Sequence, residues 1–575
     1  MFPYSRLASL AAAGLLLLAG CAPAAPAPPT TAPVPPTTAP AAKPTAPAAA
    51  PTTAPAPTAA PAATPVPQVQ GKPTVAATTA PAATTAAAPA KPTTAAAPAL
   101  TGTLRLDTIS EIESPHPYFS SQLVGISVRL NVFDSLVERD WDGKIVPGLA
   151  ESWNVVDDKT IDFKLRSGVK FHNGQDVTAN DVKASMDHML DPSIKAPSTS
   201  VFAAVKEAQV LAPMSVRLVL SKTDARIFDV LANNFSVLPG QYLKDVGVDG
   251  FAKKPIGSGP FMFVEWVKDD HLTLEANPNY WDGSYKGKPQ VKTVILRPVT
   301  DPATRLADLR SGAADMIMDV PSDQVPALKS GGFTVVEKDT TQHDYIYIDT
   351  TKDTPLKIKE VRQAVNYSVD KDSIVQSLIG GFGRPLAGPL SPLLLGYNSD
   401  VKPYAFDSAK GKALLATAGV PDGFSVDMDM TSSLPSSLAE AVVAELGDVG
   451  IKVKLNILET AVYNDRWVKK QLSPLYYNRW STFSDPALLD LLAGCKGFLS
   501  AYCNQDAQQY LDAGAATLDQ AKRDTAYKQA VKVLADDPYA IYLYQIKSLT
   551  GMSTKVTGWK GHGTSYVLFT NAMVK

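Results

Sequence analysis

The first hundred residues constrain this chain most, because they contain almost nothing that can form a packed core. Residues 22–100 are rich in Ala, Pro and Thr, have no aromatic or acidic residue, and carry charge only at Lys43, Lys72 and Lys91. Such a segment cannot bury enough apolar surface to offset the entropy lost on folding. We therefore expect residues 21–100 to be a disordered linker, extended where proline favours the polyproline conformation.

Residues 1–20 have the pattern of an export signal. Arg6 provides the positive start, residues 7–18 form a short apolar core, and Leu18-Ala19-Gly20-Cys21 ends it. Small residues directly before a cysteine match the bacterial lipobox, in which the thiol receives a lipid and the chain is cut in front of it. The apolar run is shorter than the roughly 20 residues that cross a bilayer. The sequence therefore predicts an extracytoplasmic protein, lipid-anchored to the bacterial cell membrane through Cys21, on the periplasmic side where the cell has two membranes.

The body that follows the linker has about 475 residues, enough for two or three domains. The whole chain has 54 basic and 56 acidic residues and a formal net charge of −2. A nucleic-acid-binding protein is expected to show a basic excess. We therefore expect no nucleic-acid partner, and we expect a monomer.

Strand and helix signals are mixed along the body, which predicts an α/β fold with more than one lobe. Residues 103–107 and 160–165 alternate apolar and polar side chains as strands do. A helix is expected to begin after Thr178, capped by that residue and Asp181, and a capping box at Ser437-Leu-Ala-Glu440 predicts another. Further strands are expected at 216–220, 261–264, 451–457 and 539–544, and further helices at 360–368, 373–379 and around 527–534.

Cys495 and Cys503 are the two cysteines of the body. Outside the cytoplasm, two nearby cysteines favour a disulfide. The alternative is a metal site, which needs further ligands, and no histidine lies nearby in the sequence. We expect the disulfide and no metal.

The search for an enzyme signature is mostly negative. None of the six histidines has a metal-binding spacing, and the chain has no P-loop, no complete GxGxxG and no GxSxG. Ser167-Gly-Val-Lys170 fits SxxK without its companion motifs, and Gly257-Ser258-Gly259 is an ordinary turn or a phosphate cradle. The chain is predicted not to be an enzyme and to need no cofactor, although scattered carboxylates leave a glycosidase open.

Several longer segments of the body contain recognisable motifs, which follow one another in a fixed order along the chain. They are Gly148-Leu-Ala-Glu-Ser-Trp153 with its continuation through 165–174 and 178–182, then 255–261 with 264–266 and 275–281, then Val361-Arg-Gln-Ala-Val-Asn-Tyr-Ser-Val-Asp370, Gly450-Ile-Lys-Val and Tyr502-Cys-Asn504. Together they resemble the family 5 solute-binding proteins of ABC importers, the dipeptide-, oligopeptide- and nickel-binding group. The similarity runs from about residue 101 to the C-terminus.

The resemblance implies a two-lobed, type II periplasmic-binding-protein-like fold with an additional inserted domain. Lobe I would combine about 101–147, 255–347 and 537–575, the inserted domain would be about 148–254, and lobe II about 348–536. A small solute, expected to be a peptide, would bind between the lobes and pass to an ABC importer permease. The alternatives are an exported lipoprotein hydrolase (glycosidase or peptidase) and a binding protein for sugars or another non-peptide solute.

The pocket is expected around Arg479-Trp-Ser-Thr-Phe-Ser-Asp-Pro486, which is similar to the family motif Trp-x-x-Asp-Tyr-x-Asp/Glu-Pro. In peptide-binding members the Trp packs on the ligand and the first Asp pairs with its ammonium group. Here Trp480 matches, but Phe483 stands where that Asp would be, and Asp485 either replaces it or caps the next helix. The further candidate ligand-binding residues are Arg479 (for a ligand carboxylate), Tyr477, Tyr345, His343, Tyr118 and Phe119.

Overall fold

The computed structural model describes residues 100–480 and 485–575. The export signal, Cys21 and the linker up to residue 99 lie outside the described residues, as does Phe483, so the predictions made for them stay predictions. Within the described ranges, no helix combines the length and the apolar character needed to cross a membrane.

One eleven-stranded mixed sheet runs through the body. Its main path, in spatial order, is β15 (Lys452–Leu458), β14 (Ser425–Thr431), β16 (Leu475–Trp480), β12 (Thr334–Ile348), β17 (Ala540–Met552), β11 (Met316–Ile317), β1 (Thr103–Thr108), β10 (Thr293–Pro298), β9 (His271–Ala276) and β8 (Phe261–Val267), and β13 (Gly383–Pro385) pairs with β17. The early strand β1 and the late strand β17 both pair with the short strand β11, which lies between them.

The long antiparallel pair β12 and β17 connects two parts of this sheet. At the C-terminal end of β12 the pair meets β16, and at the C-terminal end of β17 it meets β11. The register between the two strands shifts between Asp339 and His343 and again between Asp344 and Tyr345. Both the expected lobe I and the expected lobe II therefore contribute strands to one sheet, with irregular pairing where they meet.

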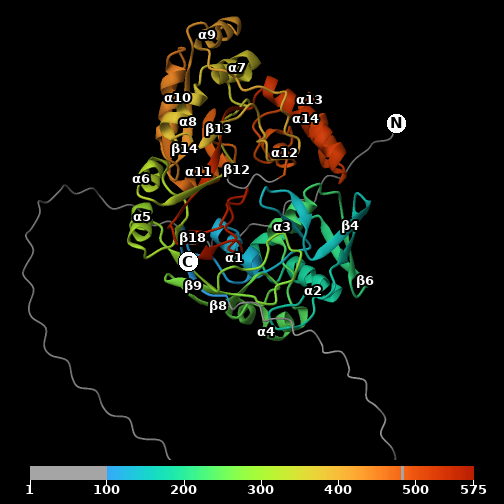
Figure 1. Cartoon of the computed structure of the whole chain (residues 1–575). Coiled ribbons are helices and arrows are strands. Elements are labelled where there is room, and N and C mark those ends of the chain that lie inside the picture. Colours follow the sequence, from blue (N-terminus) through green and yellow to red (C-terminus); the bar gives the residue numbers. More distant parts are fainter. Residues whose placement is uncertain (1–99, 481–484) are drawn as a thin grey trace, which may run out of the picture. The chain divides into compact units, whose positions relative to one another are not determined.

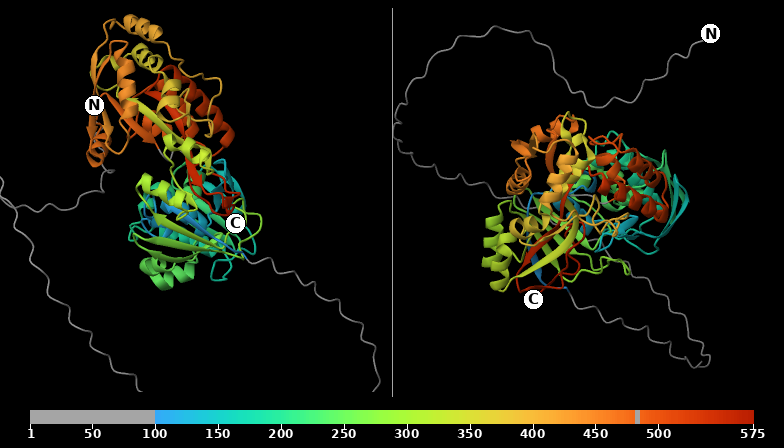
Figure 2. Two further views of the ribbon diagram at one scale, coloured as in Figure 1. Left: turned by 60° about the vertical axis from the view of Figure 1, so that its left-hand side comes forward. Right: turned by 90° about the horizontal axis from the view of Figure 1, so that it is seen from above.

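Helices cover both faces of the β14–β16–β12–β17 part. Along β12, Ile346 and Ile348 point to one face and Tyr345 and Tyr347 to the other, as the two-residue period of a strand requires. The isoleucine face packs on α7 (Lys359–Tyr367), α8 (Lys371–Leu378), α9 (Ser408–Thr417) and α10 (Ser437–Gly447), and the tyrosine face on α11 (Thr460–Val468), α12 (Leu488–Ala493), α13 (Gln505–Ala515) and α14 (Gln520–Asp536) (Figure 1). The left view of Figure 2 shows these helices, yellow to red, at one end and the blue-to-green residues at the other.

A separate four-stranded antiparallel sheet lies inside the expected inserted domain. Its order is β4 (Ala150–Asp157), β5 (Thr160–Leu165), β7 (Ser215–Leu220) and β6 (Val205–Ala212). Alternate β5 residues Ile161, Phe163 and Leu165 are buried, and α2 (Ala179–Leu190) packs on β6. The apolar core of this region continues into residues of β1 and of α1 (Leu123–Val132), so the region shares its core with the expected lobe I.

The remaining elements complete the described chain. They are the two-stranded sheets β2 (Val137–Arg139) with β3 (Ile145–Pro147) and β18 (Val556–Thr557) with β19 (Met573–Val574), the α-helices α3 (Ile227–Asn234), α4 (Gly240–Lys253), α5 (Pro302–Ser311) and α6 (Val325–Ser330), and four short 3-10 turns at Pro117–Phe119, Pro197–Phe202, Ser322–Gln324 and Pro355–Lys357.

Every strand and helix expected from the sequence is present, with ends shifted by a few residues, except that one cap differs. α2 begins directly after Thr178, whose backbone N–H donates to the Asp181 carboxylate at 3.0 Å, as predicted. The capping box at Ser437 and Glu440 was wrong, because α10 is capped one residue earlier, by Ser436, without a side-chain hydrogen bond. A capping box requires the acidic residue at the third helical position, and Glu440 stands at the fourth.

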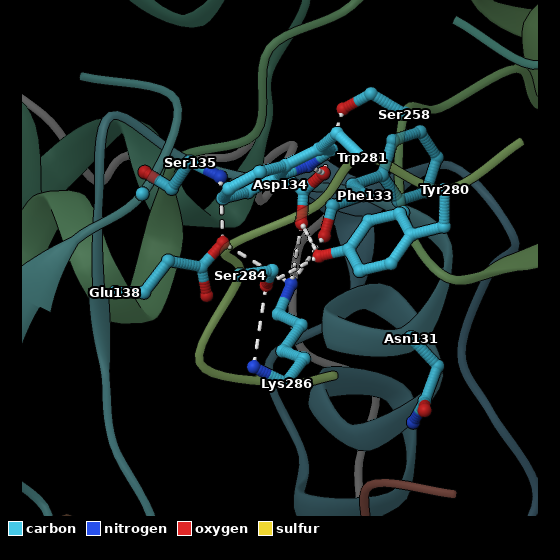
Figure 3. A network of polar contacts seen from close by, with 12 residues as sticks. Asn131, Phe133, Asp134, Ser135, Glu138, Ser258, Tyr280, Trp281, Ser284 and Lys286 are labelled. Carbon is cyan, nitrogen blue, oxygen red and sulfur yellow. Dashed lines mark hydrogen bonds and ion pairs between the residues drawn. The ribbon is translucent and has the colours of Figure 1, made fainter. Parts of the chain in front are cut away.

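Two of the family-like stretches, 255–261 and 275–281, meet at the buried carboxylate of Asp134 (Figure 3). Its oxygens accept hydrogen bonds from the Ser258 hydroxyl (3.1 Å), the Tyr280 hydroxyl (3.0 Å) and the Trp281 indole (3.0 Å). The Lys286 ammonium lies 2.7 Å from the same carboxylate, and neither side chain is exposed. The signature residues around Trp281 therefore hold the core together.

Gly257 and Gly259 belong to this junction. A Cβ atom at Gly257 would lie 2.0 Å from the carbonyl oxygen of Val132, and one at Gly259 would lie 2.6 Å from that of Asn131. Only glycine permits so close an approach to the end of α1. The Gly257-Ser258-Gly259 segment is therefore a packed turn.

Candidate ligand-binding site

A cavity of about 230 Å³ lies beside the irregular part of the β12–β17 pair. Its polar lining includes Asp319, Gln342, Arg479, Lys547, His562 and Ser565, and aromatic surface comes from Trp559 and Tyr566. Arg479 is supplied by β16, in the expected lobe II, and the others come from segments assigned to lobe I. The cavity is thus lined from both sides of the strand pair.

Two further cavities adjoin it. One of about 210 Å³ shares Tyr566 with the first, and one of about 420 Å³ shares Asp229 with the second. The third of these cavities lies between α3 with the β2–β3 hairpin on one side and residues of the expected lobe II, among them Asp485 and Arg523, on the other. The shared residues place the three cavities next to one another along the boundary between the expected lobe II and the rest of the body.

Arg479 is the predicted site residue with the most defined geometry. Its Nε lies 2.9 Å and its Nη2 3.0 Å from the two oxygens of Asp344, which is fully buried. The Tyr477 hydroxyl donates to the same carboxylate at 3.1 Å. The carboxylate raises the pKa of Arg479 above its already high ordinary value, against the effect of burial, and burial raises that of Tyr477. A ligand carboxylate at Arg479 would therefore share a guanidinium that already has a partner.

Trp480 and Asp485 flank the part of the predicted motif that lies outside the described residues. Trp480 is half-buried, and its ring meets the Trp467 ring edge-on at a centroid distance of 6.0 Å. Asp485 lines the 420 Å³ cavity, but its Oδ1 accepts hydrogen bonds from Arg523 Nη2 at 2.6 Å and from the Ala487 backbone N–H at 2.8 Å. Burial raises the pKa of Asp485. Its carboxylate is already held by a cation and by the turn that precedes α12.

The other four predicted residues pack away from these cavities. Tyr345 is fully buried and stacks on His343 at a ring-centroid distance of 4.1 Å, and burial lowers the pKa of His343 to about 3. Tyr118 is fully buried, and its hydroxyl donates to the Ser236 carbonyl at 2.6 Å. Phe119 contacts His116 edge-on. None of these four residues lines any of the three boundary cavities that the described residues form, and neither Tyr477 nor Trp480 does.

Several residues that line the first two cavities and that the sequence did not reveal come from the C-terminal segment. Trp559, His562 and Tyr566 lie in a stretch with little regular structure. His562 is held by the Thr564 hydroxyl at 2.6 Å, and burial lowers its pKa to about 4. No periodicity marks such a segment, so its density of aromatic residues was the one available signal.

Cys495 and Cys503 form a disulfide in the structure, just before α13. In the described ranges, no group of three or more His, Cys, Asp or Glu side chains is arranged to hold a metal ion.

Comparison with known proteins defines the class of this chain. The model of "Bacterial extracellular solute-binding proteins, family 5 Middle" matches residues 144–498. The chain is 30% identical over 474 residues to the glutathione-binding protein GsiB of Pectobacterium atrosepticum, covering 78% of this chain and 90% of that one. It is 28% identical over 464 residues to heme-binding protein A of Haemophilus influenzae, covering 74% and 84%.

Solved structures agree with the sequence relatives. HbpA2 from Haemophilus parasuis superposes with a TM-score of 0.74 at 25% identity, over 82% of this chain and all (100%) of that one. The periplasmic binding protein DppA from Helicobacter pylori, in complex with the peptide STSA, superposes with a TM-score of 0.67 at 25% identity. The match covers 83% of this chain and 98% of that one.

This chain belongs to the bacterial extracellular solute-binding proteins of family 5. The predicted α/β, type II periplasmic-binding-protein fold is confirmed. Members of this family are extracytoplasmic solute-binding proteins that work with ABC importers.

Proposed function

We propose that this protein is a membrane-anchored receptor that captures a small, peptide-like solute between its two lobes and delivers it to an ABC importer permease. The observation that carries the proposal is the row of three adjacent cavities, lined by residues from both sides of the β12–β17 pair. A solute held there contacts both sides at once, and its binding favours the closed arrangement of the lobes. Glutathione and a short peptide are named for two of the relatives, which supports a peptide-type solute.

The proposal includes the lobe and domain boundaries given above and the anchor at Cys21. A flexible linker of about 80 residues keeps the receptor near its permease at high effective concentration while letting it reorient. The protein itself acts by binding and has no catalytic step.

Native mass spectrometry of residues 100–575 tests the binding function. The protein is incubated with a defined mixture of glutathione, di- to tetrapeptides, disaccharides, heme and Ni²⁺, and the retained species is identified. We expect one peptide-type species to be retained and to raise the melting temperature. Retention of none of these, with no thermal shift for any, would contradict the proposal.

The anchor has its own test. Cys21→Ser in the full-length chain is expected to move the protein from the membrane fraction to the soluble fraction without changing solute affinity. Shortening the linker should reduce uptake and leave affinity unchanged. Uptake that is insensitive to linker length would assign the tract a different role, as a spacer or glycan carrier.

A further inference from the structure

Arg129 on α1 is a buried cation whose hydrogen-bonding capacity is largely unused. Its side chain is 2% exposed, and its Nη2 donates to the backbone carbonyl of Asn233 at the C-terminal end of α3. Its Nε and Nη1 have no hydrogen-bond partner in the part of the chain that the structure describes, and no carboxylate there lies within ion-pair distance. A buried guanidinium without a counter-charge is costly, and buried charges in proteins are normally paired.

A second buried arginine shows the contrast. Arg305 is also 2% exposed, but all three of its nitrogens are satisfied: Nε by the Met318 carbonyl, Nη1 by those of Val299 and Thr300, and Nη2 by that of Asp319. Such an arginine stabilises the loops that it bridges. Arg129 contacts one carbonyl and leaves two guanidinium nitrogens without a partner among the described residues, so a purely structural role does not account for it.

Arg129 does not itself line the 210 Å³ cavity at the lobe boundary, but it contacts a residue that does. Asn233, whose carbonyl it contacts, lines that cavity together with Ser121 and Tyr566. Arg129 and Tyr566 are close enough to influence each other's pKa. Burial lowers the pKa of Arg129 to about 10, which reflects the missing counter-charge, yet the group stays cationic at physiological pH.

The other charged groups around this cavity are matched. Arg226 pairs with Asp224 at 2.9 Å, and Arg139 pairs with Asp229. Among the acids with some electrostatic influence on Arg129, Glu138 is bound to Lys286 at 3.1 Å and Glu113 accepts the backbone N–H groups of Ser121 and Gln122. The surplus positive charge beside the cavity is therefore that of Arg129.

We propose that the solute has more carboxylates than ammonium groups. The additional carboxylate binds in the 210 Å³ cavity, with Arg129 as its counter-charge. This inference rests on the proposed function and names the chemical class of the solute. The sequence of 481–484 (Ser-Thr-Phe-Ser) contains no acid, and Asp485 is held by Arg523, so this part of the predicted motif offers no unpaired carboxylate for a ligand ammonium group. An acidic peptide fits this balance of charge.

A matched pair of dipeptides tests the charge preference. Ala-Glu and Ala-Gln have the same size and differ by one carboxylate, and their affinities are measured by calorimetry on wild type, Arg129→Met and Arg129→Lys. We expect wild type to bind Ala-Glu at least tenfold more tightly than Ala-Gln, Arg129→Lys to keep part of this preference, and Arg129→Met to lose it. Equal affinities in wild type, or a preference that survives in Arg129→Met, would overturn the inference.

A second measurement needs no solute. Arg129→Met removes an uncompensated buried charge, so we expect its melting temperature to equal or exceed that of wild type, whereas Arg305→Met, the matched control, lowers it by several degrees. A loss in Arg129→Met as large as that in Arg305→Met would make Arg129 a structural residue and overturn the inference. Failure of wild type to bind either dipeptide, with Arg129→Met as stable as wild type, would contradict the proposed peptide specificity while the charge argument stands on the stability result.

Discussion

Asp344 and Arg479 lie directly opposite each other on β12 and β16 and form a two-point ion pair, with Nε–Oδ1 at 2.9 Å and Nη2–Oδ2 at 3.0 Å. Asp344 belongs to a strand shared by both parts of the large sheet, and Arg479 lines the 230 Å³ cavity. The pair therefore connects the strand on which the lobes meet to the wall of the candidate site.

Removing the cation should be more harmful than removing both charges. Arg479→Met leaves the fully buried Asp344 carboxylate without its partner, which costs about 3–5 kcal/mol of unfolding free energy. The double variant Asp344→Asn/Arg479→Met should recover a large part of that loss. Urea denaturation of the single and double variants measures both, and a loss below about 1 kcal/mol in the single variant would contradict the importance of this pair.

Trp480 is expected to contact the solute through its half-buried ring, as the motif predicts. Trp480→Ala should weaken solute binding at least tenfold, about 1.4 kcal/mol, with the melting temperature of the free protein nearly unchanged. Trp266→Ala is the control, because Trp266 lies on β8, in the expected lobe I and outside the motif at 479–486. Calorimetry with the solute identified by mass spectrometry decides, and equal affinity for both variants would remove Trp480 from the site.

Asp158 joins the β4–β5 turn to the expected lobe II. Its Oδ1 accepts hydrogen bonds from the Thr517 hydroxyl and the Leu518 backbone N–H, both at 3.0 Å, and Leu518 is buried. Because this contact crosses the lobe boundary, Asp158→Ala should favour an open arrangement and increase the radius of gyration measured by solution scattering without solute. Asp157→Ala serves as control, since Asp157 bonds only to its neighbour Lys159 among the described residues. An unchanged radius in Asp158→Ala would show that the contact does not hold the lobes together.

The network in Figure 3 should make stability depend on pH. Lys286 faces two buried acids, Asp134 and Glu138, and the burial of Glu138 raises the pKa of its carboxyl above the ordinary value of 4.5. The folded protein therefore binds a proton at Glu138 that the unfolded chain has already released, so stability from this group is fully present below pH 4.5 and is lost as pH rises through the folded pKa.

Glu138→Gln is expected to remove this dependence. The variant should gain stability relative to wild type at pH 8.5 and show little gain at pH 3.5, where Glu138 is protonated in the folded protein and almost fully protonated in the unfolded chain. Urea denaturation at the two pH values measures the difference. A variant that is less stable than wild type at pH 8.5 would mean that the ionised carboxylate is needed beside Lys286.

The sequence was informative wherever local rules decide the structure. Period-2 patterns placed β1, β5, β7 and β15, and the Thr178–Asp181 pair placed the start of α2, because these signals depend on neighbouring residues alone. The ordered family segments led to the fold class and the family. The prediction of the α10 cap was wrong because two consecutive serines precede the helix, and the helix begins after the earlier one.

The site depended on long-range packing. Arg479 was placed near ligand by the motif, but its partner Asp344 is 135 residues away and no local pattern connects them. The buried surplus charge of Arg129 likewise follows from what surrounds it, since the sequence shows one arginine in an apolar helix and nothing of its partners.

From the sequence alone came the linker composition, the lipobox, the α/β class and the family, since each depends on residue types in order along the chain. Which side chains line the cavities, which charges are already paired and which carboxylates are out of a ligand's reach were decided by the tertiary structure alone. The physical reason is that burial and pairing depend on segments far apart in sequence, such as β12, β16 and the C-terminal residues 559–567, that become neighbours only when the sheet is assembled.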